Sequence, residues 1–141
     1  MNKTKGKWIK GYRKLLKKLN LEEGAHSDYN DGLCVMEAVA YLRGQQHTDM
    51  PKCVSPIIRD KMAEVNDNLR ANKERNKFLK PLIPVIINTK FGGKKLENKR
   101  RELYREWREK LGVYDMELDY DTLIENIKSF QTVIRKMARV T

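Results

Sequence analysis

One apolar stretch in the first third of the chain sets its centre: Leu33-Cys34-Val35-Met36-Glu37-Ala38-Val39-Ala40-Tyr41-Leu42. Glu37 is its single charged residue. The stretch follows Asp31, a residue type that caps helices, and it ends before Gly44, a residue type that stops them. A helix that is apolar on nearly every side must be surrounded by other elements. We therefore predict that residues 32–43 form the buried central helix of the fold.

The segments around this helix also repeat their apolar residues with helical spacing. Ser55-Pro56 is expected to begin a helix, because serine caps the free backbone amides and proline fits the first turn. The pattern Thr122-Leu123-Ile124-Glu125 is typical of a capping box, so we expect the last helix to start there. Further helices are expected at 7–20, 74–79, 81–87 and 94–111, and those at 74–79 and 81–87 are either separate or joined as one element kinked at its prolines.

Together these patterns predict an all-α, compact bundle of about six helices, folded as a single domain over residues 1–141 with a basic N-terminal helix or arm at 1–20. The mean hydropathy is −0.74, and no apolar run is long enough to span a membrane. The N-terminus lacks the apolar region of a secretory signal. We therefore expect a cytoplasmic protein without membrane contact, in which Cys34 and Cys53 remain free thiols.

Basic residues are concentrated at the N-terminus. The first twenty residues carry eight basic side chains and no acidic one, and this block supplies most of the formal net charge of +11. Apolar side chains at Trp8, Tyr12, Leu15, Leu16 and Leu19 share one face of the expected helix. The opposite face is predicted to bind nucleic acid or another polyanion through Lys10, Arg13, Lys14, Lys17 and Lys18.

A second basic cluster follows Gly92-Gly93. Four of its basic residues precede most of the glutamates in the same segment. We assign these four as secondary polyanion contacts: Lys94, Lys95, Lys99 and Arg100. Glutamates are interleaved further along the same helix, a pattern that is also typical of an ordinary solvated face. The two clusters would reinforce each other only if the fold brought them to the same side.

The stretch from His26 to Asp67 is the most motif-like part of the chain. It contains, in this order, His26-Ser27, Asp31-Gly32-Leu33-Cys34-Val35-Met36-Glu37-Ala38, Asp49-Met50-Pro51-Lys52-Cys53 and Asn66-Asp67. This order resembles a segment found in a group of small uncharacterised proteins of bacteria and their phages. The resemblance implies a shared scaffold and no established activity, and it leaves both basic clusters outside the shared segment. It suggests a phage-encoded protein that modulates its host or a defence system, with a host protein as target.

Three interpretations of this stretch remain open at the level of sequence. Cys34 in the first turn of a helix would have a lowered thiol pKa and could act as a nucleophile, with His26 or His47 as base. Alternatively, His26, Cys34 and Cys53, joined by Glu37 or Asp49, have the ligand types that zinc prefers. In the third interpretation these side chains are structural: Asp31 caps a helix, and both cysteines fill the core.

The leading hypothesis is a small, basic, non-enzymatic accessory protein that binds nucleic acid or a nucleoprotein complex with low sequence specificity. It assigns no catalytic residue, no metal and no cofactor, and it leaves the oligomeric state open. The alternative is a zinc-binding protein or a cysteine-dependent enzyme centred on His26, Cys34, Glu37 and Cys53.

Overall fold

The computed structural model describes residues 7–113 and 116–141, apart from the side chain of Asp31. All regular secondary structure in these residues is helical, which confirms the predicted all-α fold. The α-helices are α1 (Tyr12–Lys18), α2 (Val35–Leu42), α3 (Pro56–Asn68), α4 (Asn72–Leu79), α5 (Ile83–Ile86), α6 (Gly93–Lys110), α7 (Tyr120–Glu125) and α8 (Ile127–Ala138), with short 3-10 helices η1 (Tyr29–Asp31) and η2 (Lys80–Leu82). Within the described residues, two extended segments pair through one isolated β-bridge, between Leu21 and Leu33.

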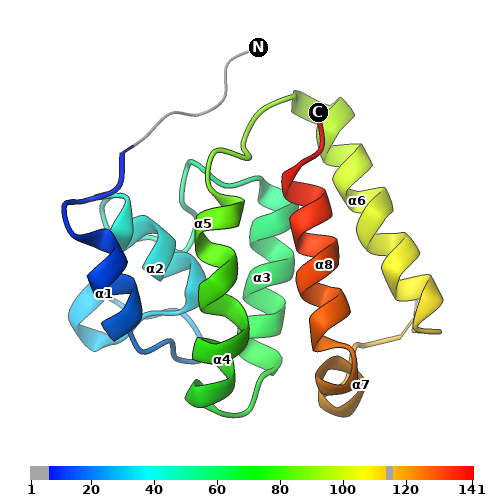
Figure 1. The fold of residues 1–141 in the computed structure, drawn as a ribbon, viewed down its shortest axis with the longest axis horizontal. Helices are drawn as coiled ribbons and strands as arrows, with labels where there is room; N and C mark the ends of the chain where they lie inside the picture. The colour runs from blue at the N-terminus through cyan, green and yellow to red at the C-terminus, as the bar shows by residue number, and fades with distance from the viewer. Residues whose placement is uncertain (1–6, 114–115) are drawn as a thin grey trace.

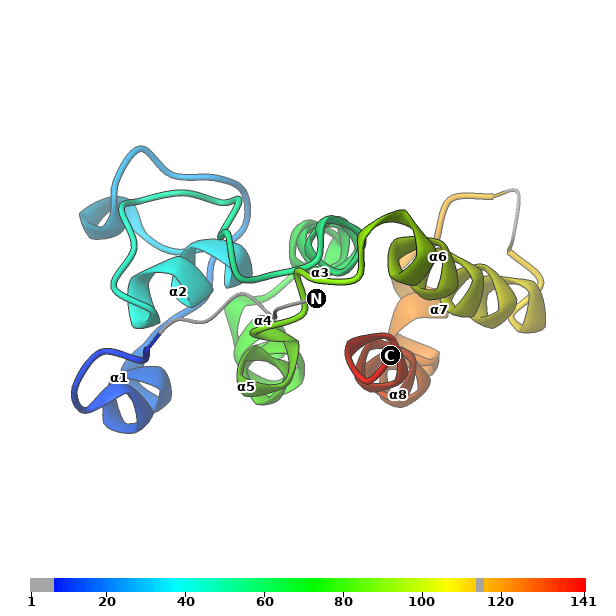
Figure 2. The same cartoon turned by 90° about the horizontal axis from the view of Figure 1, so that it is seen from above.

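The helices form two layers (Figures 1 and 2). The front layer, which faces the viewer of Figure 1, holds α1, the continuous element α4–η2–α5, and α8. The back layer holds α2, α3 and α6. The helices α1 and α6 lie at opposite ends of the long axis of the molecule.

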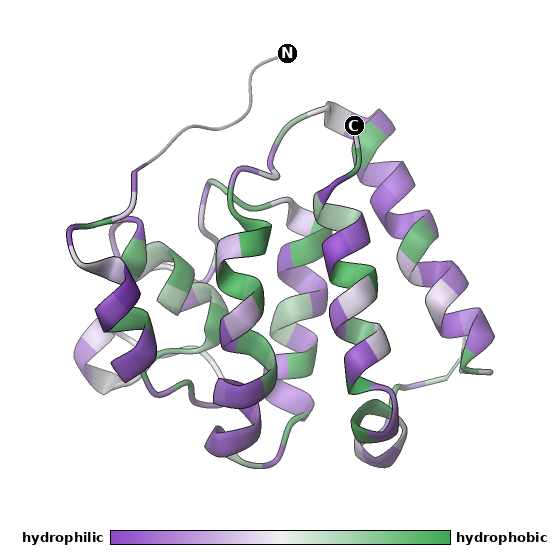
Figure 3. Cartoon of the chain, in the orientation of Figure 1, coloured by the Kyte–Doolittle hydropathy of each residue, from purple (hydrophilic) through white to green (hydrophobic). Residues whose placement is uncertain are grey.

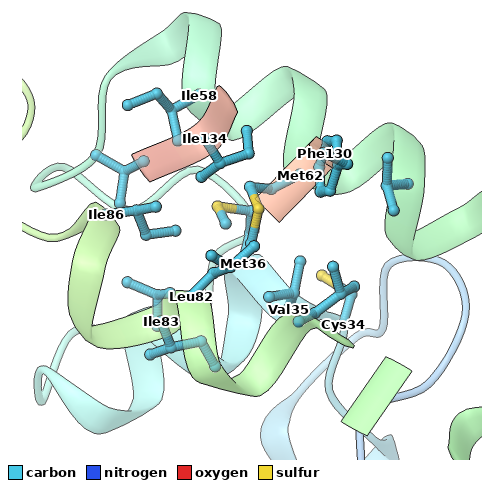
Figure 4. Close-up of a cluster of buried hydrophobic side chains, with 14 of the residues drawn as sticks. Cys34, Val35, Met36, Ile58, Met62, Leu82, Ile83, Ile86, Phe130 and Ile134 are labelled. Carbon is cyan, nitrogen blue, oxygen red and sulfur yellow. The ribbon is translucent and has the colours of Figure 1, made fainter. Parts of the chain in front are cut away.

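The core lies between the layers, and α2 is buried as predicted. All residues of α2 except Tyr41 are buried, including Glu37. Figure 4 shows Val35 and Met36 of α2 among apolar side chains of α3, α8 and the α4–η2–α5 element. One cluster of buried side chains extends from Leu21 to Met137. Burial of about 25 cal/mol per Å² of apolar surface makes this cluster the main source of stability.

The start of α2 differs from the prediction. The helix begins at Val35, and its cap is Cys34 rather than Asp31, whose side chain lies outside the described part. The Cys34 Sγ atom accepts a hydrogen bond from the backbone amide of Glu37 at 3.4 Å. In return, the Glu37 carboxylate accepts one from the backbone amide of Cys34 at 2.8 Å. This is a capping box in which a thiol takes the place of the usual hydroxyl.

The last helical segment also begins earlier than the capping-box pattern predicts. Asp119 caps α7 by accepting a hydrogen bond from the backbone amide of Thr122 at 2.7 Å. The chain then breaks its helical conformation at Asn126, where α8 follows directly. The predicted cap at Thr122 is therefore wrong by one turn, because the carboxylate of Asp119 reaches the free amides first.

Two other boundaries confirm the sequence-based prediction. Ser55 caps α3, and Pro56 occupies its first turn. Pro81 and Pro84 fall in the first turns of η2 and α5, so residues 80–86 are helical and continue α4. When α4–η2–α5 and α7–α8 are each counted as one interrupted element, the predicted number of about six is recovered. Across residues 7–113 and 116–141 no helix has the length and apolar character needed to cross a bilayer.

Candidate functional site

The helix α1 presents its basic residues to solvent, as predicted. Its apolar side chains pack against the core. The predicted contact residues are all exposed, Lys10 in the turn before α1 and the others on the helix: Arg13, Lys14, Lys17 and Lys18. The predicted stripe of apolar residues therefore fixes which way the cations point. The hydropathy colours of Figure 3 show the contrast between α1, which is largely hydrophilic, and α2 behind it.

The end of α1 is joined to α4, which extends the basic surface. The Nδ2 atom of Asn76 donates a hydrogen bond to Oδ1 of Asn20 at 2.8 Å, and Lys80 Nζ donates to the backbone oxygen of Lys17 at 3.2 Å. Lys73, Lys77 and Lys80 recur every three to four residues, so they share one face of the α4–η2 element. No local sequence pattern indicates these three lysines, because their proximity to α1 depends on the packing of distant segments.

The third helix of the front layer adds further cations. Gln131 Nε2 donates a hydrogen bond to the backbone oxygen of Phe78 at 3.0 Å, which holds α8 beside α4. Lys128 and Arg135 lie one turn from Gln131 in each direction, and Lys128 is exposed. The helix α8 contains no acidic residue. The helix α8 therefore adds three basic residues and no acidic one to the layer that contains α1 and α4.

Charge is divided unequally between the two layers. The front-layer helices carry eleven lysines and arginines (four on α1, four on α4 and η2, three on α8) and one acidic residue, Glu74. The back-layer helices carry ten basic and eight acidic residues. Arg75 is the one front-layer cation that is buried, where it donates to the backbone oxygens of Asn66 and Leu69. The remaining ten front-layer cations are exposed or half-buried.

Ion pairs are also more frequent in the back layer, where four of the ten cations of the helices have one, against one of eleven in the front layer. In the part of the chain that the structure describes, no ion pair includes a basic residue of α1, η2 or α8, and on α4 only Arg75 has one. On α6, by contrast, Arg105 pairs with Glu102 and Glu109, and Arg108 lies 3.8 Å from Glu64. The front layer therefore offers cations without internal counter-ions.

The second predicted cluster is only partly exposed and lies at the other end of the molecule. Lys94, Lys95 and Lys99 are exposed, and Lys99 Nζ donates to the backbone oxygen of Thr141 at 3.3 Å. Arg100 is fully buried, so its assignment as a polyanion contact is wrong. Figures 1 and 2 place α6 and α1 at opposite ends of the long axis, so the two clusters do not merge.

Arg100 has an internal structural role. Its Nε donates to the backbone oxygen of Met137 at 3.2 Å, and its Nη1 donates to that of Phe91 at 3.4 Å. Its Nη1 atom also lies 3.6 Å from Glu97 Oε1. The side chain thus ties α6 to the end of α8. Burial lowers the pKa of Arg100. The negative charge of Glu97 acts in the opposite direction and raises this pKa, but by less.

The two aromatic residues before and within α1 are engaged with each other. The rings of Trp8 and Tyr12 are stacked, with centroids 4.3 Å apart and an interplanar angle of 6°. The Arg13 guanidinium lies over Tyr12 and the Arg43 guanidinium over Trp8. Because these ring faces are occupied, neither aromatic side chain offers the platform on which a nucleic-acid base would stack.

The motif-like stretch converges on one buried carboxylate. Glu37 is fully buried and accepts hydrogen bonds from the backbone amides of Cys34 and His26, the latter at 2.9 Å. His26 Nδ1 lies 2.9 Å from one carboxylate oxygen of Glu37, and His47 Nε2 lies 2.9 Å from the other. Burial would raise the pKa of Glu37, but the hydrogen bonds from Cys34 and His26 outweigh it and hold this pKa below its usual value.

The surroundings of both thiols disfavour a nucleophilic role, because both side chains are buried. Burial raises the pKa of Cys34 to about 12, against the expectation of a lowered value. At this position, desolvation and the adjacent Glu37 carboxylate raise the thiol pKa by more than the helix N-terminus would lower it. Burial also raises the pKa of Cys53. Both thiols are free, as expected, and both belong to the hydrophobic core.

The zinc alternative finds no geometric support. Over the ranges 7–113 and 116–141, no three histidine, cysteine, aspartate or glutamate side chains are placed to hold a metal ion together. Glu37 connects His26, His47 and Cys34, but Cys53 is placed elsewhere, where its carbonyl accepts from the amide of Thr89 at 3.1 Å. Asp49 is exposed. The arrangement around Glu37 ties the loops before and after α2 to that helix.

No protein-family model, curated protein or solved structure matches this chain. The resemblance of residues 26–67 to bacterial and phage proteins therefore stays a hypothesis.

Proposed function

We propose that this protein binds nucleic acid, alone or within a nucleoprotein complex, through the front layer and without catalysing a reaction. The observation that carries this proposal is the set of ten accessible cations on the front-layer helices, none of which forms an ion pair with another described residue. Lysine and arginine side chains that replace condensed counter-ions on phosphates release those ions, and this release drives sequence-independent binding. A phosphate backbone is a regular array of negative charges that suits such an extended surface.

The contacts in this proposal are to phosphates rather than to bases. Lysines dominate the exposed side of α1 and α4, and lysine acts on phosphate as a point charge. The stacked pair of Trp8 and Tyr12 has no free ring face for a base. We therefore expect low sequence specificity and a preference for a duplex, whose density of phosphate charge exceeds that of a single strand.

The test is a titration of labelled nucleic acid at several salt concentrations, followed by fluorescence anisotropy. Short duplex and single-stranded DNA of unrelated sequences serve as ligands. The α1 variant, Lys14→Ala/Lys17→Ala/Lys18→Ala, is expected to bind at least tenfold more weakly in low salt. The slope of log affinity against log salt should fall by about 2–3, because each lost phosphate contact removes about 0.9 from it.

The helix α6, at the opposite end of the folded molecule from α1, offers a matched control. The α6 variant, Lys94→Ala/Lys95→Ala/Lys99→Ala, loses the same charge from exposed positions of the back layer. It should retain nearly the affinity and salt slope of the unchanged protein. Equal losses in the two variants would contradict a defined face and indicate only non-specific attraction. Absence of binding to either nucleic acid would overturn the proposal and favour an acidic host protein as the ligand of this face.

A further inference from the structure

The basic helix α1 depends on other parts of the molecule for its position. It has seven residues, none of them buried, and its first turn has neither a side-chain cap nor an acidic residue. A helix this short is unstable on its own in water. Its half-buried Tyr12, Leu15 and Leu16 pack against the core. Apolar contacts are non-directional, so they decide which side of α1 faces the core but leave its placement along its neighbours to other contacts.

Directional contacts hold α1 at both ends. Before the helix, the backbone amide of Ile9 donates a hydrogen bond to the backbone oxygen of Leu42 at 2.8 Å. After it, the chain reaches α4 (Figure 1), where the side chain of Asn76 binds it twice. The Oδ1 atom of Asn76 accepts from the backbone amide of Leu21, and its Nδ2 donates to Oδ1 of Asn20, both at 2.8 Å. Because a hydrogen bond requires alignment of donor and acceptor, the Asn76 amide holds the end of α1 against α4 at one place.

Asn76 lies among the cations of the proposed face. Lys73 and Lys77 are exposed on either side of it along α4. Lys80, one turn beyond Asn76, donates from Nζ to the backbone oxygen of Lys17 at 3.2 Å. Two side chains of the α4–η2 element therefore bind the segment at the end of α1. The element that carries one part of the basic face thus also holds the other part.

We infer that Asn76 is a positioning residue of the nucleic-acid face: it sets α1 against α4, so that one stretch of phosphates contacts the lysines of both helices at once. This inference rests on the function proposed above. A cation that is held in place before binding loses less conformational freedom on binding than one on a loose segment, so a fixed array binds more tightly. Asn76 carries no charge, so its effect on affinity is separable from that of the lysines.

Asn76→Ala is the decisive variant, because it removes both hydrogen bonds and leaves the formal net charge of +11 unchanged. Hydrogen exchange of the backbone amides in residues 12–19 should be about tenfold faster than in the unchanged protein, since α1 opens more often. Anisotropy titration with duplex DNA in low salt should show about tenfold weaker binding, because the loosened lysines must be ordered on binding. Circular dichroism confirms that the variant is folded.

The α1 variant supplies a readout that a purely structural role would not change. Its three lysines contribute fully to binding only while α1 is held against α4. Their removal should therefore weaken binding less in the Asn76→Ala background than in the unchanged protein, as expected for two changes that act through the same contact. Additive losses would show that Asn76 does not act through α1 and would overturn the inference.

Asn98→Ala is the matched control, because it removes an exposed amide side chain from α6, outside the front layer. It should change neither the hydrogen exchange of α1 nor the affinity for DNA. If the unchanged protein binds duplex DNA, then unchanged exchange or unchanged affinity in Asn76→Ala would overturn this inference alone. Absence of binding by the unchanged protein would overturn the proposed function, and this inference with it.

Discussion

The two layers of this protein hold their charged side chains in different ways. In the back layer Glu37 and Arg100 are fully buried, and both are bound by several groups of the chain itself. In the front layer, cations such as Lys14, Lys17 and Lys18 reach solvent and have no counter-ion within residues 7–113 and 116–141. A charge that the fold requires is surrounded by internal partners, whereas a charge without them is available to an external one.

The largest effect in this comparison is expected when the buried carboxylate is removed. Glu37→Ala leaves two backbone amides and the His26 imidazole without the carboxylate that they contact, and it removes the carboxylate that lies 2.9 Å from His47 Nε2. Removing one member of a buried charged network costs about 3–5 kcal/mol. Urea unfolding of this variant should therefore show a loss of free energy of unfolding in that range.

Glu106→Ala provides the matched control, since Glu106 is an exposed glutamate within a helix. Surface substitutions of this kind change stability by about 0.5 kcal/mol or less. Glu37→Gln should fall between the two, because the amide keeps the volume and one acceptor oxygen. A Glu37→Ala variant as stable as Glu106→Ala would show that the network around this carboxylate does not support the fold.

The burial of Glu37 could be predicted from sequence, but its partners could not. A lone glutamate in a nearly continuous apolar run must be buried and must find donors. His26 and His47 lie eleven and ten residues away in loops, where no periodicity indicates which way a side chain points. The thiol cap was missed for a related reason, since Cys34 is a weak acceptor and Asp31 a strong one.

Arg100 shows a different limit of sequence analysis. It follows Leu96 by four residues and precedes Trp107 by seven, so it falls on the buried stripe of α6. Helical spacing alone therefore contained the signal for its burial, but the neighbouring lysines favoured a surface assignment. The contribution of Lys73, Lys77 and Lys80 to the basic face depends on tertiary packing of α4 against the end of α1, and no local pattern encodes it.

A smaller effect is expected from acid titration of the same carboxyl group. Its hydrogen bonds hold the pKa of Glu37 in the folded state below the value of an unfolded chain, which is about 4.3. The stabilisation is therefore complete above that unfolded value and is lost as the pH falls through the lower folded value. Unfolding free energies measured at several pH values from 5 downwards should decrease more steeply for the unchanged protein than for Glu37→Gln. Parallel curves would mean that ionised Glu37 adds nothing to stability.

The smallest effect on stability is expected in the front layer, at the residues with the largest expected effect on binding. The α1 variant, with alanine at positions 14, 17 and 18, should change the free energy of unfolding by only about 0.5 kcal/mol. At low salt the change should be a gain, because mutual repulsion of unpaired cations is removed and alanine favours a helix. Urea unfolding in low and high salt measures this gain, which should shrink as salt screens the repulsion. A loss of more than 1–2 kcal/mol would show that these lysines support the fold.

A cation whose removal leaves stability unchanged and abolishes nucleic-acid binding is maintained for a partner. Measuring both stability and binding in the same variant therefore separates a role in the fold from a role in binding.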